Sequence, residues 1–310
     1  MYDPKVEPYW DQSHHEGEIR RIFNICHGCR LCFNLCPSFV DLFGAIDAKD
    51  ENPENLDRQD YERIGDLCYE CRLCYLRCPY TPPHEFNLDF PRLMLRGKAL
   101  NAKKSGIKLR DRLMGNTDLL GTLGKYTAPL ANFGNSFAPV RLVMEKAVGV
   151  SSQARLPRYH WQTFRDWFVG RQGSKPAEPA AKVALFYTCM VNYNVPDEGK
   201  AMVRVLEHNN VEMALPRQRC CGIPYLDGGN VEAAQGNARS NVEALAERVR
   251  QGYDIVAPES TCAYVLKFEY PLLVAGADGE LVAKHTYDIS EYLGKMNREG
   301  KLKKEFVKNP

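Results

Sequence analysis

The sequence predicts two kinds of domain in one chain, an all-helical domain followed by an α/β domain with a parallel sheet. Two cysteine-rich motifs lie in the first hundred residues, flanked by helical segments and separated by residues 38–67, a spacer long enough for one or two helices. Beyond residue 180 the pattern changes to strand, helix, strand. This alternation is typical of an open parallel sheet with helices on both faces.

Each N-terminal motif is a ladder of four cysteines with the spacing Cys-x-x-Cys-x-x-Cys-x-x-x-Cys-Pro. The first ladder contains Cys26, Cys29, Cys32 and Cys36, and the second contains Cys68, Cys71, Cys74 and Cys78. Bacterial ferredoxins hold [4Fe–4S] clusters with this spacing, and the fourth cysteine of a run binds the other cluster in two-cluster proteins. We therefore predict two [4Fe–4S] clusters, one on Cys26, Cys29, Cys32 and Cys78 and the other on Cys68, Cys71, Cys74 and Cys36.

Zinc and disulfides fit the ladders less well. Structural zinc prefers paired C-x₂₋₄-C elements set well apart. A disulfide framework suits a small secreted domain, whereas this chain has 310 residues and its first residues lack the basic and apolar regions of a signal peptide. Reduced thiols in this number need a reducing compartment, so we expect a cytoplasmic protein.

The remaining composition limits the partners. The formal net charge of +2 does not suggest a nucleic-acid partner. No apolar run reaches the length of a transmembrane helix. Membrane contact is therefore expected to be peripheral, on the inner face of the cell membrane, or through a partner.

We divide the chain into three parts. Residues 1–97 are expected to form an α-helical ferredoxin domain with two clusters, and residues 98–180 a helical connector. Residues 119–148 are the least polar stretch; they could dock a membrane or flavoprotein partner, or pack as a linker against both neighbours. The polar, proline-containing residues 173–181 are the expected boundary before the C-terminal domain of residues 181–310.

The C-terminal domain carries a second group of cysteines. Strands are expected at residues 183–188, 211–215 and 253–257, with helices at 197–209 and 231–251. The four cysteines Cys189, Cys220, Cys221 and Cys262 each follow the carboxyl end of a strand, where ligand sites of open α/β sheets form. We predict that they converge on a metal, either a third iron–sulfur cluster or zinc; redox-active or simply buried thiols are the alternatives.

Smaller features lead to further expectations. The ladders share an arginine, Arg30 and Arg72, which could hydrogen-bond sulfide or thiolate or could be ordinary surface arginines. His27 lies inside the first ladder, and the pair His14-His15 is expected to be solvent-exposed. No set of residues indicates hydrolytic chemistry, so we assign no catalytic residue.

The Cys220-Cys221-Gly222 element with the later Cys262, behind a twin-ladder domain, resembles the iron–sulfur subunits built from cysteine-rich "CCG" domains. These include the anaerobic glycerol-3-phosphate dehydrogenase C subunit, the glycolate oxidase iron–sulfur subunit and heterodisulfide reductase subunits. Residues 109–113 and 156–167 are most similar to the glycerol-3-phosphate dehydrogenase subunit. The resemblance covers nearly the whole chain and implies an electron-transfer role.

Two departures from the family pattern stand out. The family repeat ends in Cys-x-x-Cys, but here Val265 occupies the last position, so the five-cysteine cluster that the resemblance implies lacks one ligand. The family usually carries two repeats, whereas this sequence has one. We therefore expect either a fragment, which we favour, or a short member that relies on a partner.

The resulting function hypothesis is an iron–sulfur electron-transfer subunit rather than a stand-alone catalyst. It would carry electrons from a flavoprotein dehydrogenase acting on glycerol 3-phosphate or a 2-hydroxy acid toward quinone or another acceptor. No complete Gly-rich dinucleotide motif follows a strand, so the flavin is expected on another polypeptide. The alternative is a heterodisulfide or thiol–disulfide reductase with its chemistry at the Cys-Cys-Gly site, and a third is a zinc-stabilised interaction module.

Overall fold

The computed structural model describes residues 2–171 and 176–305. These residues form two compact units, and each is described by itself. The first unit takes the chain up to Gly115 together with Pro224–Glu232, and the second takes the described residues of Asn116–Ile223 and Ala233–Pro310. The three-part division at residues 97 and 180 stays a prediction. Of the expected boundary segment, Gly173, Ser174 and Lys175 lie outside the described residues.

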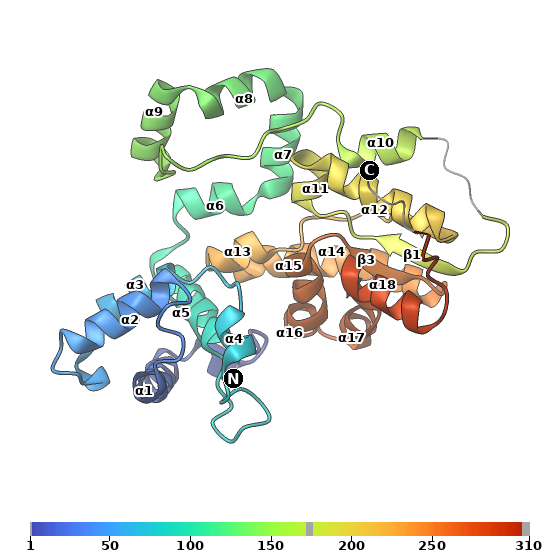
Figure 1. Cartoon of the computed structure of the whole chain (residues 1–310). Helices are drawn as coiled ribbons and strands as arrows, with labels where there is room; N and C mark the ends of the chain where they lie inside the picture. The colour runs from blue at the N-terminus through green and yellow to red at the C-terminus, as the bar shows by residue number, and fades with distance from the viewer. Residues whose placement is uncertain (1, 172–175, 306–310) are drawn as a thin grey trace. The chain divides into compact units, whose positions relative to one another are not determined.

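The first unit contains helices and no strand among its described residues. Its elements are η1 (Glu7–Trp10), α1 (Gln12–Cys29), α2 (Pro37–Asp47), η2 (Pro53–Asn55), α3 (Arg58–Asp66), α4 (Leu73–Arg77), α5 (Phe90–Ser105), α6 (Leu109–Gly115) and the segment around α13 (Ile223–Asp227). Figure 1 shows α1 to α6 in blue to green. The all-helical ferredoxin-type domain predicted from the ladder flanks is confirmed.

Aromatic side chains form the core of this unit. Phe39 of α2 stacks on Phe90 of α5 with ring centroids 4.5 Å apart, and Phe23 of α1 stacks on the same Phe90 ring at 6.1 Å. Five of the eight ladder cysteines pack against this core, namely Cys26, Cys32, Cys36, Cys74 and Cys78, and Cys68 belongs to it. The core therefore fixes both ladders from one side and keeps water from that side.

The second unit is an α/β domain. Its N-terminal helices are α7 (Thr117–Tyr126), α8 (Ala128–Ser136), α9 (Ala138–Val148) and α10 (Phe164–Gly170). The remaining elements are β1 (Ala181–Leu185), α11 (Cys189–Tyr193), α12 (Pro196–His208), β2 (Val211–Ala214), α14 (Val231–Arg250), β3 (Asp254–Ala257), α15 (Ser260–Tyr264), η3 (Val265–Glu269), α16 (Tyr270–Leu273), α17 (Ala277–Lys284), β4 (Thr286–Asp288) and α18 (Ile289–Arg298).

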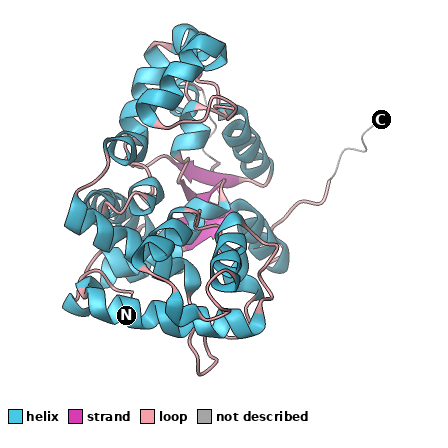
Figure 2. Cartoon of the chain, turned by 90° about the vertical axis from the view of Figure 1, so that its left-hand side faces the viewer, coloured by secondary structure: helices cyan, strands magenta, loops and turns pink. Residues whose placement is uncertain are grey.

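The four strands form one parallel sheet in the order β2-β1-β3-β4, with helices on both sides (Figure 2). The three predicted strands and the two predicted long helices of this domain are present. The sequence pattern does not predict β4, because this strand is three residues long and carries no apolar run. The chain leaves β1 toward β2 and later returns to the other side of β1 for β3, so the topological switch point lies between β1 and β3.

Among the helices of the described residues, none combines the length and the apolar character needed to cross a bilayer.

Candidate metal centres

The two ladders turn in the same way, through a left-handed arginine. Helix α1 ends at Cys29 and Arg30 follows with φ 48°, while in the second ladder Arg72 has φ 58° and α4 begins directly after it. This conformation reverses the chain between the second and the third cysteine of each ladder. Sequence reasoning could not find it, because arginine has no preference for the left-handed region.

The structure brings together the four cysteines predicted for the first cluster. Cys26, Cys29, Cys32 and Cys78 all line one small cavity of the first unit. Burial and the neighbouring Cys32 and Cys78 raise the pKa of Cys26, and burial and Cys78 raise the pKa of Cys32 to about 11. Buried thiols such as those of Cys26 and Cys32 stay protonated unless a bound metal stabilises the thiolates, so the site fits an iron–sulfur cluster.

Three of the four cysteines predicted for the second cluster also lie near one another. Burial is the largest cause that raises the pKa of Cys74, and the nearby thiols of Cys32, Cys36 and Cys71 raise it further. Cys68 has a different close neighbour: its Sγ donates to Oε1 of Glu70 at 3.4 Å. Cys32 is therefore near both groups, and the assignment of cysteines to two clusters stays a prediction.

The two shared arginines have carboxylate partners. Arg30 Nη1 donates to Asp47 Oδ2 at 3.1 Å, and its Nη2 lies 3.0 Å from His27 Nδ1. Arg72 Nη2 donates to Asp89 Oδ2 at 2.9 Å, and both side chains are buried. Arg72 is therefore not an ordinary surface arginine, and Arg30 is the more exposed of the two.

A buried carboxylate distinguishes the second ladder from the first. Burial raises the pKa of Glu70 to about 8, although Lys98 and Arg72 lower it in part. The same Lys98 donates through Nζ to the backbone oxygen of Cys68 at 2.8 Å and pairs with Asp227 at 2.5 Å. The segment around α13 is thereby tied to the ladder that contains Cys68.

The four C-terminal cysteines are brought together at the carboxyl ends of β1, β2 and β3. Cys262 Sγ lies 3.3 Å from Cys221 Sγ, and the thiols of Cys189 and Cys220 hydrogen-bond to each other. The hydrogen bond with Cys220, then burial, raises the pKa of Cys189. The bond with Cys189 lowers the pKa of Cys220, but Cys221 and burial raise it more, to about 12. This chain of four buried or half-buried thiols fits a metal that would stabilise them as thiolates.

Four polar residues that sequence reasoning missed surround these thiols. Glu259 Oε2 lies 3.8 Å from Cys262 Sγ, and the Glu259 carboxylate also accepts from the Thr188 hydroxyl. The Thr117 hydroxyl lies beside Cys189 and Cys220, and Asp118 Oδ2 accepts from the backbone N–H of Cys220 at 3.1 Å. Thr188 and Glu259 could have been found, since both lie near a cysteine at a strand end, but nothing in the sequence connects Thr117 and Asp118 to the site.

Gly222, which follows the cysteine pair, has φ 100°, and a Cβ there would lie 3.4 Å from the Ala234 backbone. Backbone conformation and contact with α14 therefore account for this glycine.

An open cleft of about 710 Å³ lies against the same site within the second unit. Cys189 and Cys220 are in its wall, together with Tyr187, Tyr193 and the three arginines Arg165, Arg217 and Arg219. Arg219 acts electrostatically on Asp118 in the same wall, whereas Arg165 and Arg217 form no ion pair among the described residues. The volume is that of a small-molecule site, and the guanidinium groups of Arg165 and Arg217 favour an anionic ligand.

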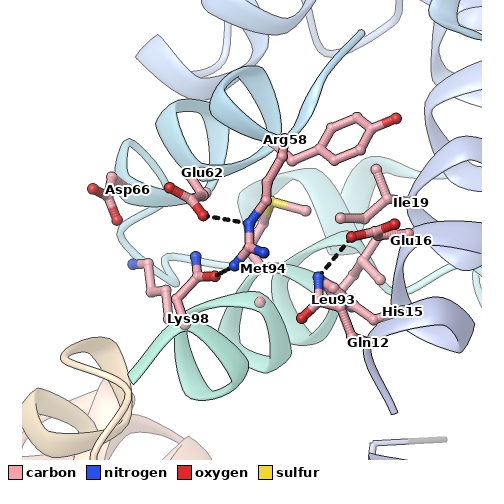
Figure 3. Close-up of a pocket in the computed structure, with 14 residues that line it drawn as sticks. Gln12, His15, Glu16, Ile19, Arg58, Glu62, Asp66, Leu93, Met94 and Lys98 are labelled. Atoms are coloured by element: carbon pink, nitrogen blue, oxygen red, sulfur yellow. Dashed lines mark hydrogen bonds and ion pairs between the residues drawn. The ribbon is translucent and has the colours of Figure 1, made fainter. Parts of the chain in front are cut away.

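Another small cavity lies between α1, α3 and α5 of the first unit (Figure 3). Its volume of about 30 Å³ has room for water and not for a substrate. His15 lies at this cavity and is buried, so the expectation that both histidines of the His14-His15 pair are exposed was wrong for His15. Burial, helped by Arg96 and His14, lowers the pKa of His15 to about 3, so this ring is neutral.

Within residues 2–171 and 176–305, no three Cys, His, Asp or Glu side chains meet closely enough to hold a single metal ion. A four-iron cluster spreads its thiolates over separate irons, so its ligands need not meet at one point.

Comparison with known protein families agrees with both domains. Residues 19–103 match the model described as the citrate utilization protein B Fer4-like domain, and residues 183–267 match the cysteine-rich domain, CCG. The resemblance based on the Cys-Cys-Gly element and the twin ladder is thereby confirmed. Ferredoxin-like and cysteine-rich modules in one chain indicate iron–sulfur clusters.

The chain is also similar to individual proteins. It is 33% identical to the anaerobic glycerol-3-phosphate dehydrogenase C subunit of Escherichia coli K12 over 62% of this chain and 49% of that protein. It is 32% identical to the B subunit of fumarate reductase (CoM/CoB) of Methanothermobacter marburgensis over 40% of the chain and 24% of the relative. Lactate utilization protein A of Geobacillus kaustophilus is 33% identical over 36% of the chain and 47% of the relative.

The matched part of the chain thus spans about half the length of the first relative, or less in the second. No solved structure matches the chain.

Proposed function

We propose that the chain is an iron–sulfur electron-transfer subunit of a multi-subunit oxidoreductase. The observation that carries the proposal is the cavity of the first unit whose wall contains Cys26, Cys29, Cys32 and Cys78, which come from both ladders. An iron–sulfur cluster bound there takes up and returns one electron at a time. Relatives that are named as subunits of a dehydrogenase and a reductase support the same role.

The chain's own residues do three things in this proposal. The ladder cysteines supply the thiolates, [4Fe–4S] being the type that the spacing favours. The aromatic core around Phe39 and Phe90 excludes water from one side of the ladders, and burial is one of the factors that set a cluster's potential. The four C-terminal cysteines hold a third metal group, a cluster or zinc.

The electron donor in this proposal is a flavoprotein dehydrogenase subunit that oxidises glycerol 3-phosphate or a 2-hydroxy acid. The acceptor is quinone at the membrane. The relatives named for glycerol-3-phosphate dehydrogenase and lactate utilization support these substrate classes. A cytoplasmic protein held peripherally on the inner face of the membrane would meet both partners.

Helices α7 to α9 offer the surface for this peripheral contact. Their apolar side chains remain exposed within the second unit, most of all Leu130, Tyr126, Val143 and Phe133 at 76%, 69%, 65% and 64%. Only Gly121, Gly124, Ala128 and Arg141 of these helices are buried. Of the two expectations for this stretch, the packed linker does not account for so much exposed apolar surface, and we assign the face to the membrane.

The experiment is anaerobic purification of the chain with the products of its neighbouring genes. We expect a flavoprotein to co-purify, dye-linked dehydrogenase activity with glycerol 3-phosphate or a 2-hydroxy acid, and at least about eight irons per chain, from two four-iron clusters. A preparation with full iron but no flavoprotein and no such activity would exclude the dehydrogenase role.

A second candidate function is reduction of a disulfide at the C-terminal cysteine site. The observation that favours it is the open cleft of about 710 Å³ with Cys189 and Cys220 in its wall. A disulfide would take up two electrons from the partner subunit and two protons to give two thiols. If the EPR spectrum of the reduced protein does not change on adding a disulfide, this candidate is eliminated.

A further inference from the structure

Glu259 is a carboxylate in an unusual position. It follows β3 directly before α15, with Oε2 3.8 Å from the Cys262 thiol, and it is also close enough to Cys189 to act on it electrostatically. Within the described chain it forms no ion pair with a lysine, arginine or histidine. The other charge that acts on it is a second carboxylate, Glu198.

The surroundings of this carboxylate change when the cysteines bind metal. While the thiols are protonated, the carboxylate accepts from the Cys262 thiol and from the Thr188 hydroxyl. Once a metal holds Cys262 as a thiolate, that donor is lost, and buried charges in proteins are paired or coordinate metals. A bound metal would offset the negative charge of Glu259 and of the four cysteines together.

The distances between side chains suit ligands of a common metal group. A metal ion binds thiolate sulfur at about 2.3 Å and carboxylate oxygen at about 2.0–2.2 Å, so two ligands of one ion lie roughly 3.5 Å apart, and five ligands can be shared among the metal ions of a cluster. The Cys262–Glu259 separation is 3.8 Å and the Cys262–Cys221 separation is 3.3 Å. Both pairs are near that value.

Thr188 holds the Glu259 carboxylate in this position at a cost in backbone strain. Its φ is 57° and its ψ is 158°, a conformation that is an outlier for a β-branched residue. In this conformation the hydroxyl accepts from the Val191 N–H at 3.2 Å and donates to Glu259. Strain of this kind persists where the surrounding structure requires it, commonly at functional sites.

The position of the absent fifth cysteine cannot contribute a ligand. Val265 is fully buried at the start of η3, and its side chain has no donor atom. We propose that Glu259 takes over this role and is a carboxylate ligand of the metal group held by Cys189, Cys220, Cys221 and Cys262. This proposal rests on the third metal site put forward under the proposed function.

The test compares four forms of the full chain, purified anaerobically: wild type, Cys262→Ser, Glu259→Gln and Glu198→Gln. Metal that is lost in Cys262→Ser defines the third site. We expect Glu259→Gln to release this metal to a chelator at least about tenfold faster than wild type, with an altered EPR or Mössbauer signal. Glu198→Gln removes a nearby carboxylate that does not touch a thiol, and it should behave as wild type.

Glu259→Cys is the complementary variant, because it restores a fifth thiolate. It should retain the metal and give an EPR or Mössbauer signal different from wild type. Circular dichroism checks that each variant folds. If Glu259→Gln does not fold, the signal of Glu259→Cys decides whether residue 259 is a ligand. If wild type and Cys262→Ser hold the same metals, the third site itself is wrong. If they differ but Glu259→Gln matches wild type in release rate and spectrum, only the ligand role of Glu259 is overturned.

Discussion

Arg72 and Asp89 form a buried ion pair, with Nη2 and Oδ2 2.9 Å apart, at the turn of the second ladder. The corresponding residue of the first ladder, Arg30, pairs with Asp47 in a half-exposed position. The two ladders therefore share a left-handed arginine with a carboxylate partner, but only the second pair lies inside the protein. This difference gives a matched pair of variants.

Asp89→Asn should destabilise the protein by about 3 kcal/mol, because it removes the negative charge that faces the buried Arg72 guanidinium. Asp89 also caps α5 by accepting from the Arg92 N–H, and asparagine is as good a cap, so the substitution removes the ion pairs of Asp89 with Arg72 and Arg92 and keeps the cap. Urea denaturation under anaerobic conditions measures the change. Asp47→Asn, the equivalent change in the first ladder, should leave the midpoint unchanged; equal effects would contradict the difference in burial.

The predicted exchange of the fourth cysteines can be tested with double variants. If Cys78 serves the cluster of the first ladder, Cys29→Ser with Cys78→Ser removes two ligands from one cluster and leaves the other about four irons intact. Cys29→Ser with Cys36→Ser should damage both clusters. Iron analysis and EPR of the two double variants distinguish the arrangements, since uncrossed ligation gives the opposite result.

Buried His15 should make stability fall as the pH is lowered. Its folded pKa is depressed to about 3, so between about pH 6.5 and pH 3 the unfolded state binds the proton and the folded state does not. Above the unfolded pKa, protonation of His15 does not lower the free energy of unfolding. At about pH 5.5 it lowers this free energy by about 1.4 kcal/mol. His15→Gln should remove this loss between about pH 7.5 and 5.5, while the exposed His14→Gln should retain it. If wild type and His15→Gln lose the same stability between these pH values, His15 is protonated in the folded protein.

Gly229 should not tolerate a side chain. Its φ is 74°, and a Cβ would lie 2.5 Å from the Lys98 backbone oxygen, in the segment tied to the second ladder. We expect Gly229→Ala to cost about 2 kcal/mol or more, from backbone strain and the displaced contact. Gly236→Ala in α14 has open space and should be neutral or stabilise by up to about 1 kcal/mol. The two urea midpoints give the comparison, and a neutral Gly229→Ala would refute it.

The exposed apolar face of α7 to α9 should control membrane binding. Leu130→Ser with Phe133→Ser removes two of its most exposed apolar side chains, so binding of the protein to vesicles of bacterial lipids should fall several-fold in flotation assays. Phe268→Ser removes an exposed aromatic ring elsewhere in the second unit and should have no effect. Equal binding by all three forms would assign the face to something other than the lipid surface.

The ladders, the helical and α/β domains, and the group of C-terminal cysteines follow from the sequence alone. These features depend on local spacing and periodicity, which are written along the chain. The folded structure was needed to show that Cys78 lines the cavity of Cys26, Cys29 and Cys32, that His15 is buried, and that Thr117 and Asp118 lie beside Cys220. Such contacts join residues distant in sequence, and their energies come from burial and charge in a folded interior, which no local pattern records.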